Sequence, residues 1–344
     1  MGITEIALII GFILSFLMAI AMGGNDASTP CSDVVGAGVL TIKQAVILFA
    51  IFAAIGAMSQ GFMVMKTIGT GIVPSINLLG AIVIVLSSFV WVMFCNMYGL
   101  EISVTHSIIG GVFGYGIAVY GIGGVQWSLI QTIVVSWFAS PALAMIGAFL
   151  LYKLLAALVT KYEGFSKVMP LILKLALCYS AYAFGANDIG NATGVYVTVT
   201  TMALGHTPEY SVMLLLSILG SVGIAIGGLW LGPRVISTVA FKILKLNVVS
   251  GTAAEVTNAM VVHLFTVLPY MLIGYGVPIS TSLANIGALV GAGIASYGSS
   301  GFNRRTVFVL TISWIATVLI TAILAFIGYL TLFPLIGPIL APEL

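Results

Sequence analysis

Two short motifs place a carboxyl group inside apolar sequence. Gly-Gly-Asn-Asp at 23–26 returns as Gly-Ala-Asn-Asp at 185–188, and each copy interrupts a stretch that is otherwise typical of a membrane-spanning helix. An aspartate in the hydrocarbon of a bilayer is costly, so it normally faces a partner, a cavity or an ion path. Asp26 and Asp188, at matching places of one chain, therefore predict a paired internal site of the kind that transporters use.

The oxygen atoms around the two motifs favour a small hard cation such as Na⁺, or a proton. We expect each helix to break at its motif and expose backbone carbonyl groups beside the carboxylate. The neighbouring glycines (Gly23, Gly24, Gly185, Gly190 and Gly194) would permit the unusual backbone angles. A helix cap or an interhelical hydrogen bond is the alternative for each single copy. The expected cation ligands are Asn25, Asp26, Asn187, Asp188, Asn191 and Glu255.

Two Ser/Thr-rich segments, at 101–107 and 278–282, each begin a new helix after a short break. Serine and threonine cap helix N-termini, and Pro278 lies just upstream of the second segment. Unpaired N–H groups and hydroxyls at such a terminus form a ready anion site, whereas capping without a ligand is the alternative. A histidine there could donate to the anion, carry a proton or simply pack. The expected anion contacts are Ser103, Thr105, His106, Ser280, Thr281 and Ser282.

Neither pair of motifs contains a lysine or an arginine. An anion would therefore be held by N–H groups, hydroxyls and cations that bind with it. Because two aspartates are also present, the site stays strongly negative unless cations or protons enter with the anion. Coupling to a cation gradient follows as an electrostatic expectation, with Na⁺ or H⁺ co-transported and no other cofactor.

The composition points to the bilayer as the main solvent of this chain. It is 61% hydrophobic and 6% charged, whereas soluble domains carry about 25% charged residues. There is no basic tract, so we expect no nucleic-acid partner. The first apolar segment has no basic leader and runs into the first motif, which indicates a retained helix rather than a signal peptide. A multi-pass protein of the cell (plasma) membrane is expected, with a homodimer as one assembly open to it.

The chain divides into two related halves. The segment 102–121 aligns with 279–298 without a gap, at 10 identities in 20 positions, and each follows its own Asn-Asp motif. We expect repeat one at 1–152, a cytoplasmic linker at 153–169 and repeat two at 170–344. The fold class is an all-α polytopic membrane protein with two inverted-topology repeats, broken helices and Ser/Thr-rich helical hairpins. About 10–12 transmembrane segments are expected, since a span needs ~20 apolar residues.

Loop charge gives the orientation. If each apolar stretch crosses once and the linker is cytoplasmic, ten of the eleven lysines and arginines lie inside, and only Lys66 lies outside. The positive-inside rule favours this arrangement. Both termini then lie outside, with five crossings in each half. An odd number of crossings inverts the second half relative to the first.

At these motifs the chain resembles the inorganic phosphate transporter (PiT) family, which carries a Gly-Ala-Asn-Asp signature in each half. The segments at 103–111 and 278–282 resemble its Ser/Thr-rich elements, and Gly-Thr-Ala-Ala-Glu at 251–255 is similar to a further element. The resemblance implies inward symport of inorganic phosphate with Na⁺ or H⁺. By position it implies that Asn25, Asp26, Asn187 and Asp188 serve the cations. The serines and threonines of the other two segments would then hold the anion.

The chain departs from the family pattern at several places. The first signature continues as Ala-Ser-Thr-Pro at 27–30, where the family usually has a small residue followed by Asn-Ala. Leu283 occupies the place of a second histidine, and Glu101 stands where a proline is common. Related permeases carry sulfate. Retention of both aspartates favours phosphate, because monohydrogen phosphate has an O–H that a carboxylate can accept and sulfate has none.

Three other functions remain open at this point. A sulfate or other oxyanion symporter would share the fold, and a passive anion channel would lack coupling to a gradient. An intramembrane prenyltransferase would use aspartate-rich motifs with Mg²⁺. Asp33 follows Asp26 by seven residues, but no second aspartate lies near Asp188. The clusters that this enzyme needs are therefore missing.

Overall fold

The computed structural model describes residues 3–204, 210–298 and 302–340, and every regular element in these ranges is a helix. The first half contains α1 (Ile3–Asp26), α2 (Ser28–Gly36), α3 (Ile42–Gln60), α4 (Phe62–Thr70), α5 (Leu78–Tyr98), α6 (Val104–Tyr120), the short 3-10 helix η1 (Ile122–Gly124) and α7 (Trp127–Lys161). The second half contains α8 (Phe165–Thr193), α9 (Val195–Leu204), α10 (Tyr210–Trp230), α11 (Gly232–Lys242), α12 (Val248–Ile273), α13 (Thr281–Tyr297) and α14 (Arg304–Leu340). The two halves thus repeat one order of helices.

The helices are built for a bilayer. In the described part of the chain, eight helical stretches are long and apolar enough to cross a membrane, and α6 is a shorter apolar helix. Large apolar side chains cover the outside of the bundle, among them Phe138, Met271 and Leu335, each about three-quarters exposed. An apolar surface of this extent is unfavourable in water and favourable against lipid. The predicted class, an all-α polytopic membrane protein, is confirmed.

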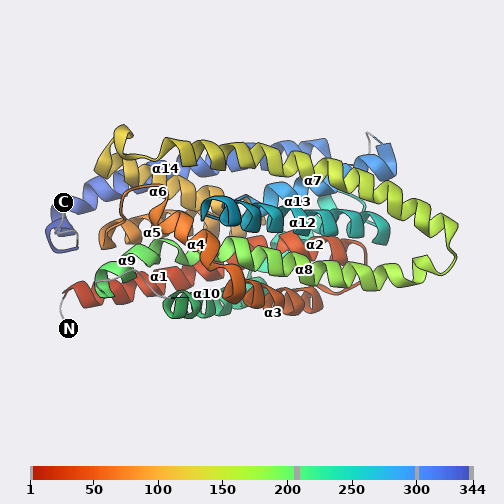
Figure 1. Cartoon of the computed structure of the whole chain (residues 1–344), viewed down its shortest axis with the longest axis horizontal. Coiled ribbons are helices and arrows are strands. Elements are labelled where there is room, and N and C mark those ends of the chain that lie inside the picture. The colour runs from red at the N-terminus through yellow and green to blue at the C-terminus, as the bar shows by residue number, and fades with distance from the viewer. Residues whose placement is uncertain (1–2, 205–209, 299–301, 341–344) are drawn as a thin grey trace.

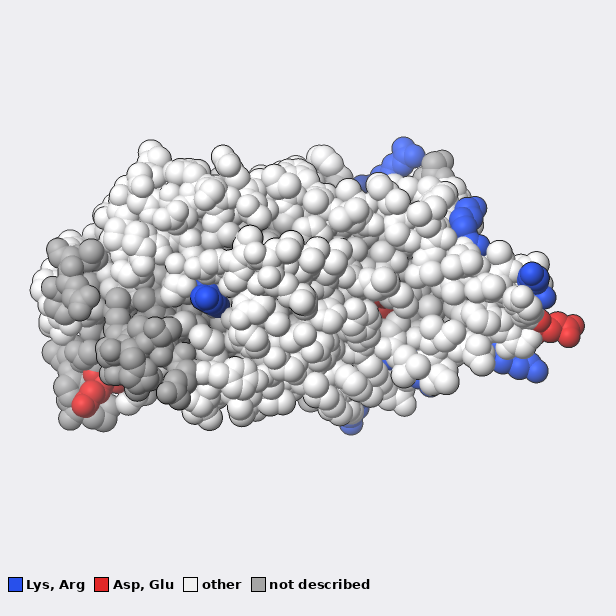
Figure 2. Space-filling view, in the orientation of Figure 1, with Lys and Arg blue, Asp and Glu red and all other residues white. Residues whose placement is uncertain are grey.

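The ends of the chain reveal the inverted topology. Both termini lie at one end of the bundle, and the connection from α7 to α8 lies at the opposite end (Figure 1). Most lysines and arginines gather at the end that holds this connection (Figure 2). The predicted linker at 153–169 is mostly helical, because α7 continues to Lys161 and α8 begins at Phe165. Its charged side chains extend from helix ends that project beyond the apolar bundle.

Two helical hairpins enter the bundle from opposite ends. The pair α5–α6 occupies one half of the long axis and the pair α12–α13 occupies the other (Figure 1). Asn77 caps the N-terminus of α5 and Asn247 caps that of α12. The second helix of each hairpin ends at a glycine with positive φ, Gly121 at 66° and Gly298 at 70°, a backbone conformation that favours glycine. The same residue types therefore shape both hairpins.

The helix breaks differ between the halves. In the first half the interruption falls at Ala27, directly after the motif. In the second half α8 continues through Asp188 to Thr193, and the interruption falls at Gly194. The expectation of a break at both motifs was therefore wrong for the second. The second motif thus lies wholly within α8, and Asp188 accepts there from the side chain of Asn191.

Glycines allow close contact between helices of different halves. A Cβ atom on Gly23 of α1 would collide with the backbone of Ile224 on α10, and one on Gly185 of α8 would collide with Ala53 on α3. Neither glycine has a positive φ. The prediction that these residues serve unusual backbone angles was wrong, because close approach of two helix backbones is what requires them.

The second helices of the hairpins pack in the same way. Gly114 of α6 lies against the backbone of Ala322 on α14, and Gly291 of α13 lies against that of Met145 on α7. These two glycines correspond in the alignment of 102–121 with 279–298. Each half thus lends its last helix to the hairpin of the other half: α14 packs on α6, and α7 packs on α13.

Candidate functional site

The turns of the two hairpins meet inside the bundle through a reciprocal pair of hydrogen bonds. The hydroxyl of Thr105 on α6 donates to the carbonyl oxygen of Ile279 at 3.0 Å. The hydroxyl of Ser282 on α13 donates to the carbonyl oxygen of Ile102 at 3.2 Å. The partners correspond in the repeat alignment, so the contact has twofold pseudosymmetry. It places the N-termini of α6 and α13 next to each other among buried residues.

Two serines cap these N-termini with the same geometry. Ser103 has φ and ψ of −87° and 109°, and Ser280 has −88° and 106°. Each hydroxyl oxygen accepts the backbone N–H of the third helical residue, His106 or Leu283, at 3.2 Å. A hydroxyl that accepts still has its own proton to donate. Together with the first N–H groups of each helix, which have no partner within the helix, these serines form a donor-rich surface.

Asp188 lies beside the first hairpin. Its Oδ1 accepts from Nδ2 of Asn191 at 2.8 Å and lies 3.2 Å from Oγ1 of Thr105. The hydroxyl of Thr281 is also a neighbour of this carboxylate. Its Oδ2 has no hydrogen-bond partner among the described residues, although the side chain is only 1% exposed. The carboxylate therefore retains a buried acceptor that is free for a cation or a proton.

Asp26 is the second buried carboxylate of this region. It is 1% exposed, and its Oδ1 has no hydrogen-bond partner in the described structure. Its charge lies within interaction range of Asp188 and of Glu101. The structure therefore brings the aspartates of the two motifs together, as the matched motifs predict. Their mutual repulsion makes a shared positive counter-charge favourable.

The two motif asparagines tie the motif helices to the hairpin turns. Asn25 donates through Nδ2 to the carbonyl oxygen of Leu100 at 2.9 Å, and its Oδ1 accepts the N–H of Ile102 at 2.9 Å. Asn187 donates through Nδ2 to the carbonyl oxygen of Val277 at 3.0 Å. Leu100 and Val277 each lie two residues before the aligned segments 102–121 and 279–298. Both asparagines thus hold a hairpin in place, and the amide oxygen of Asn187 remains without a partner in the described part of the chain.

A second pair of buried acidic residues, Asp33 and Glu255, is separate from the aspartates of the motifs. Glu255 on α12 is fully buried, and both its carboxylate oxygens lack a hydrogen-bond donor among the described residues. Asp33 on α2 is its neighbour, and Ser180 on α8 also lies beside it. Asn258 donates to Ser180 at 3.3 Å. Glu255, an expected cation ligand, therefore belongs to a group with Asp33 rather than to direct contacts of Asp26 or Asp188.

His106 lies on another side of α6. Its ring centroid is 3.8 Å from that of Trp137 on α7, and its Nδ1 is 3.4 Å from the carbonyl oxygen of Trp314 on α14. Thr105, the preceding residue, instead contacts Asp188. The structure therefore gives His106 a packing environment between two tryptophans. It does not bring this ring to the serine caps.

The charge of the region is strongly one-sided. Five carboxylates are buried in the described structure, and none of the lysines or arginines that it describes is buried with them. Isolated buried charges are costly, so they need cations, protons or hydrogen-bond donors as compensation. The five are Asp26, Asp33, Glu101, Asp188 and Glu255.

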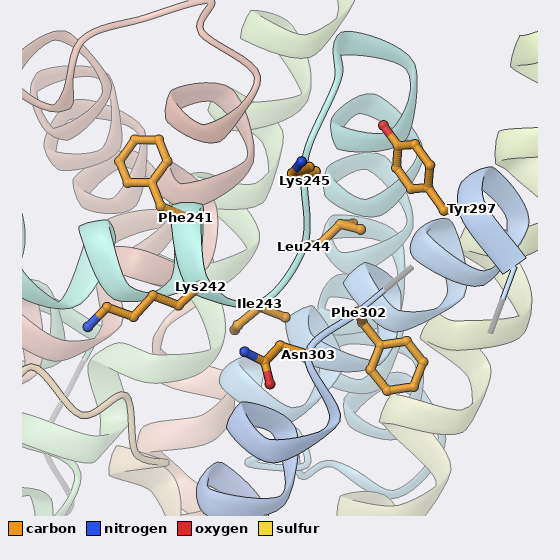
Figure 3. A pocket seen from close by; sticks show the side chains of 8 residues that line it. All are labelled: Phe241, Lys242, Ile243, Leu244, Lys245, Tyr297, Phe302 and Asn303. Carbon is orange, nitrogen blue, oxygen red and sulfur yellow. The ribbon is translucent and has the colours of Figure 1, made fainter. Parts of the chain in front are cut away.

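A surface cavity of about 450 Å³ lies apart from these carboxylates. It is lined by the end of α11, the segment that follows it, the end of α13 and the two residues before α14, with Lys242, Lys245 and Asn303 among its residues. The side chain of Lys242 extends away from the other labelled side chains (Figure 3). The two lysines therefore do not converge on one anion. The buried region, not this cavity, carries the matched motifs.

Two buried carboxylates, Asp33 and Glu101, are absent from the predicted site residues although the sequence contains a signal for each. Asp33 stands two helical turns after Asp26, which is a signal for a shared helix face. Glu101 departs from the family pattern, and a carboxylate in an apolar hairpin is itself a signal for a site. Ser28 and Thr29, which follow the first motif after Ala27, lie beside Glu101.

Comparison with known proteins identifies relatives over nearly the whole chain. The pattern of the "Phosphate transporter family" matches twice, over residues 22–177 and 163–325. A Pyrococcus furiosus protein named "Putative phosphate permease" is 31% identical and covers 96% of this chain and 97% of its own. "Inorganic phosphate transporter 2-1, chloroplastic" of Arabidopsis thaliana is 26% identical, over 92% of this chain and 70% of its own.

A solved structure has the same fold. It is described as "The sodium-dependent phosphate transporter" and superposes with a TM-score of 0.82 at 27% identity. The alignment covers 96% of this chain and 99% of the other. These relatives are permeases and transporters, and the membrane enzyme that the sequence left open is thereby excluded.

Proposed function

Because the chain belongs to the phosphate transporter family, we propose that it is a secondary active transporter that carries inorganic phosphate inward across the cell membrane together with Na⁺. The sodium-dependent transporter of the same fold supports Na⁺ over H⁺ as the coupling ion. Alternating access of the central site to the two sides of the membrane completes the proposal.

One observation carries this proposal: the motif of each half and the hairpin of each half converge on one buried region. Thr105 of the first hairpin contacts Asp188 of the second motif and Asn191, which lies just after that motif. The hairpin turns contact each other through Thr105 and Ser282. Carboxylates suited to cations thus lie next to helix N-termini suited to an anion. A symporter needs this proximity, because each ligand then lowers the electrostatic cost of the other.

The anion would bind where α6 and α13 begin. Ser103 and Ser280 accept backbone N–H groups and keep their own protons, so they can donate to phosphate oxygens. Thr281 and the first N–H groups of both helices complete the donor set. Since no described lysine or arginine is buried there, phosphate would enter only with cations at Asp26 and Asp188.

Uptake by the purified protein in liposomes tests the proposal. Radiolabelled phosphate and radiolabelled sulfate are supplied separately, under an imposed Na⁺ gradient, an imposed pH gradient or neither. We expect phosphate to accumulate only under an inward Na⁺ gradient. Accumulation of sulfate would identify an oxyanion symporter of another specificity, dependence on the pH gradient would identify H⁺ coupling, and equilibration without accumulation would identify a channel.

A further inference from the structure

Glu101 is a buried carboxylate that neither motif includes. It lies in the turn between α5 and α6 and is 0% exposed. Its Oε1 accepts from Oγ1 of Thr29 at 3.3 Å, while its Oε2 has no hydrogen-bond partner among the described residues. A carboxylate in such a position needs a counter-charge.

Two hydroxyl groups beside Glu101 donate hydrogen bonds to backbone carbonyl oxygens. The hydroxyl of Ser28 donates to the carbonyl oxygen of Asn25 at 2.7 Å, and that of Ser282 donates to the carbonyl oxygen of Ile102 at 3.2 Å. Both hydroxyl oxygens nevertheless neighbour the Glu101 carboxylate. A hydroxyl has one proton, so it cannot serve its carbonyl oxygen and the Glu101 carboxylate at the same time. A cation between the hydroxyl oxygens and the carboxylate would contact all of them without needing that proton.

The surrounding charges strengthen this demand. Asp26 lies within interaction range of Glu101, and so does Asp33. No lysine or arginine of the described chain is buried near them. The region thus concentrates negative charge without a basic side chain to balance it.

We propose that Glu101 is the centre of a further Na⁺ site, with the hydroxyl oxygens of Ser28, Thr29 and Ser282 as its other ligands. One carboxylate with neutral hydroxyls suits a monovalent cation, whereas Ca²⁺ sites take more carboxylates. No group of three or more acidic, histidine or cysteine side chains suited to a metal ion occurs in the described chain, which agrees with this preference. The site rests on the proposed function and gives that symporter one more coupling ion.

Equilibrium binding of radioactive ²²Na⁺ to the purified full-length protein, without phosphate, tests the site. We expect Glu101→Gln to bind one Na⁺ fewer per chain than the wild type. Glu163→Gln removes a carboxylate from the exposed α7–α8 connection and should bind as the wild type does. Equal Na⁺ stoichiometry and affinity in Glu101→Gln and the wild type would overturn the proposal. That result is the one expected if a proton, rather than Na⁺, neutralises Glu101.

A second variant covers the case in which Glu101→Gln does not fold, as judged by size-exclusion chromatography and thermal unfolding. Thr29→Val keeps the shape of the side chain and removes one ligand oxygen. We expect this variant to bind the same number of Na⁺ ions as the wild type. The affinity for one of these ions should fall by roughly tenfold, the equivalent of one lost polar contact. An unchanged binding curve for Thr29→Val would contradict the site.

The same preparations separate this inference from the proposed function. If the wild type accumulates no phosphate but Glu101→Gln still loses one Na⁺, the cation site stands and the phosphate proposal fails. If phosphate uptake follows the Na⁺ gradient and Glu101→Gln binds Na⁺ as the wild type does, the function stands and the site fails.

Discussion

The hydroxyl oxygen of Thr105 lies 3.2 Å from Oδ1 of Asp188, so the hairpin of the first half touches the motif of the second. The same hydroxyl lies 3.0 Å from the carbonyl oxygen of Ile279. One proton can serve only one of these acceptors well. A cation on Asp188 would release Thr105 towards the other hairpin, and in this way ion binding can adjust the contact between the hairpins.

We expect Asp188→Asn to abolish Na⁺-driven phosphate accumulation while the protein still reaches the membrane. The substitution keeps the shape of the side chain and removes the charge that would hold the cation. A loss of about a hundredfold in uptake rate is expected, equivalent to roughly 3 kcal/mol for one partner of a buried charge pair. Uptake into liposomes with matched protein content measures it.

Asp26→Asn should have the same effect, because Asp26 and Asp188 hold equivalent places in the two motifs. Glu163→Gln, on the exposed connection, is the matched control and should transport normally. Wild-type rates in both aspartate variants would contradict the paired site.

Ser280→Ala should weaken phosphate affinity more than Na⁺ affinity. The hydroxyl caps α13 and has a proton available for an anion, so its removal takes one hydrogen bond from the bound phosphate, at about 1 kcal/mol or roughly fivefold in affinity. Ser103→Ala should behave alike, since the two caps share one geometry. Competition binding of phosphate at fixed Na⁺ measures the effect, with Ser313→Ala, which removes a hydroxyl bonded within α14, as the control. A larger change in Na⁺ affinity would assign these serines to the cation.

Asn25→Ala should lower the thermal stability of the protein. Its amide joins α1 to the hairpin turn through Leu100 and Ile102, and removal leaves buried backbone groups unpaired at about 1–3 kcal/mol. We expect a lower unfolding temperature in detergent. Asn187→Ala should destabilise less, because the Oδ1 of Asn187 has no partner in the described structure. A lower unfolding temperature for Asn187→Ala than for Asn25→Ala would contradict the role of Asn25 in holding the hairpin turn against α1.

Gly185→Ala should prevent correct packing of α8 on α3. The added methyl group would collide with the backbone of Ala53, which no side-chain movement can relieve, and overpacking typically costs about 1–3 kcal/mol or more. Gly123→Ala, in exposed η1 with open space around the added atom, is the matched control. Yield of monodisperse protein measures both variants. An undiminished yield of Gly185→Ala would contradict this prediction and would show that α3 and α8 can move apart without loss of the fold.

The sequence predicted the membrane class, the inverted order and the convergence of the two aspartates. Composition indicates the membrane class and loop charge indicates the inverted order, because only a helix or a closed barrel can satisfy its backbone hydrogen bonds inside a bilayer. The convergence followed from repetition: residues at matching places in inverted halves face one another.

The local details were harder to predict. The helix break in the second half lies at Gly194 rather than at the motif, and Asp188 receives hydrogen bonds from side chains, not from freed backbone groups. The glycines were assigned to backbone freedom, whereas they serve interhelical contact. The position of His106 between Trp137 and Trp314 depends on helices far away in sequence. Such neighbours have no local signature.

The packing of α1 against α10 has a consequence for biosynthesis. The glycine contact of Gly23 needs the backbone of Ile224, which leaves the ribosome about 200 residues later. At about 5–20 residues per second this delay is roughly 10–40 s. During that interval the newly inserted first helix carries Asp26 without its final neighbours. The cost of an aspartate without its partners therefore applies to the nascent chain until the second half arrives.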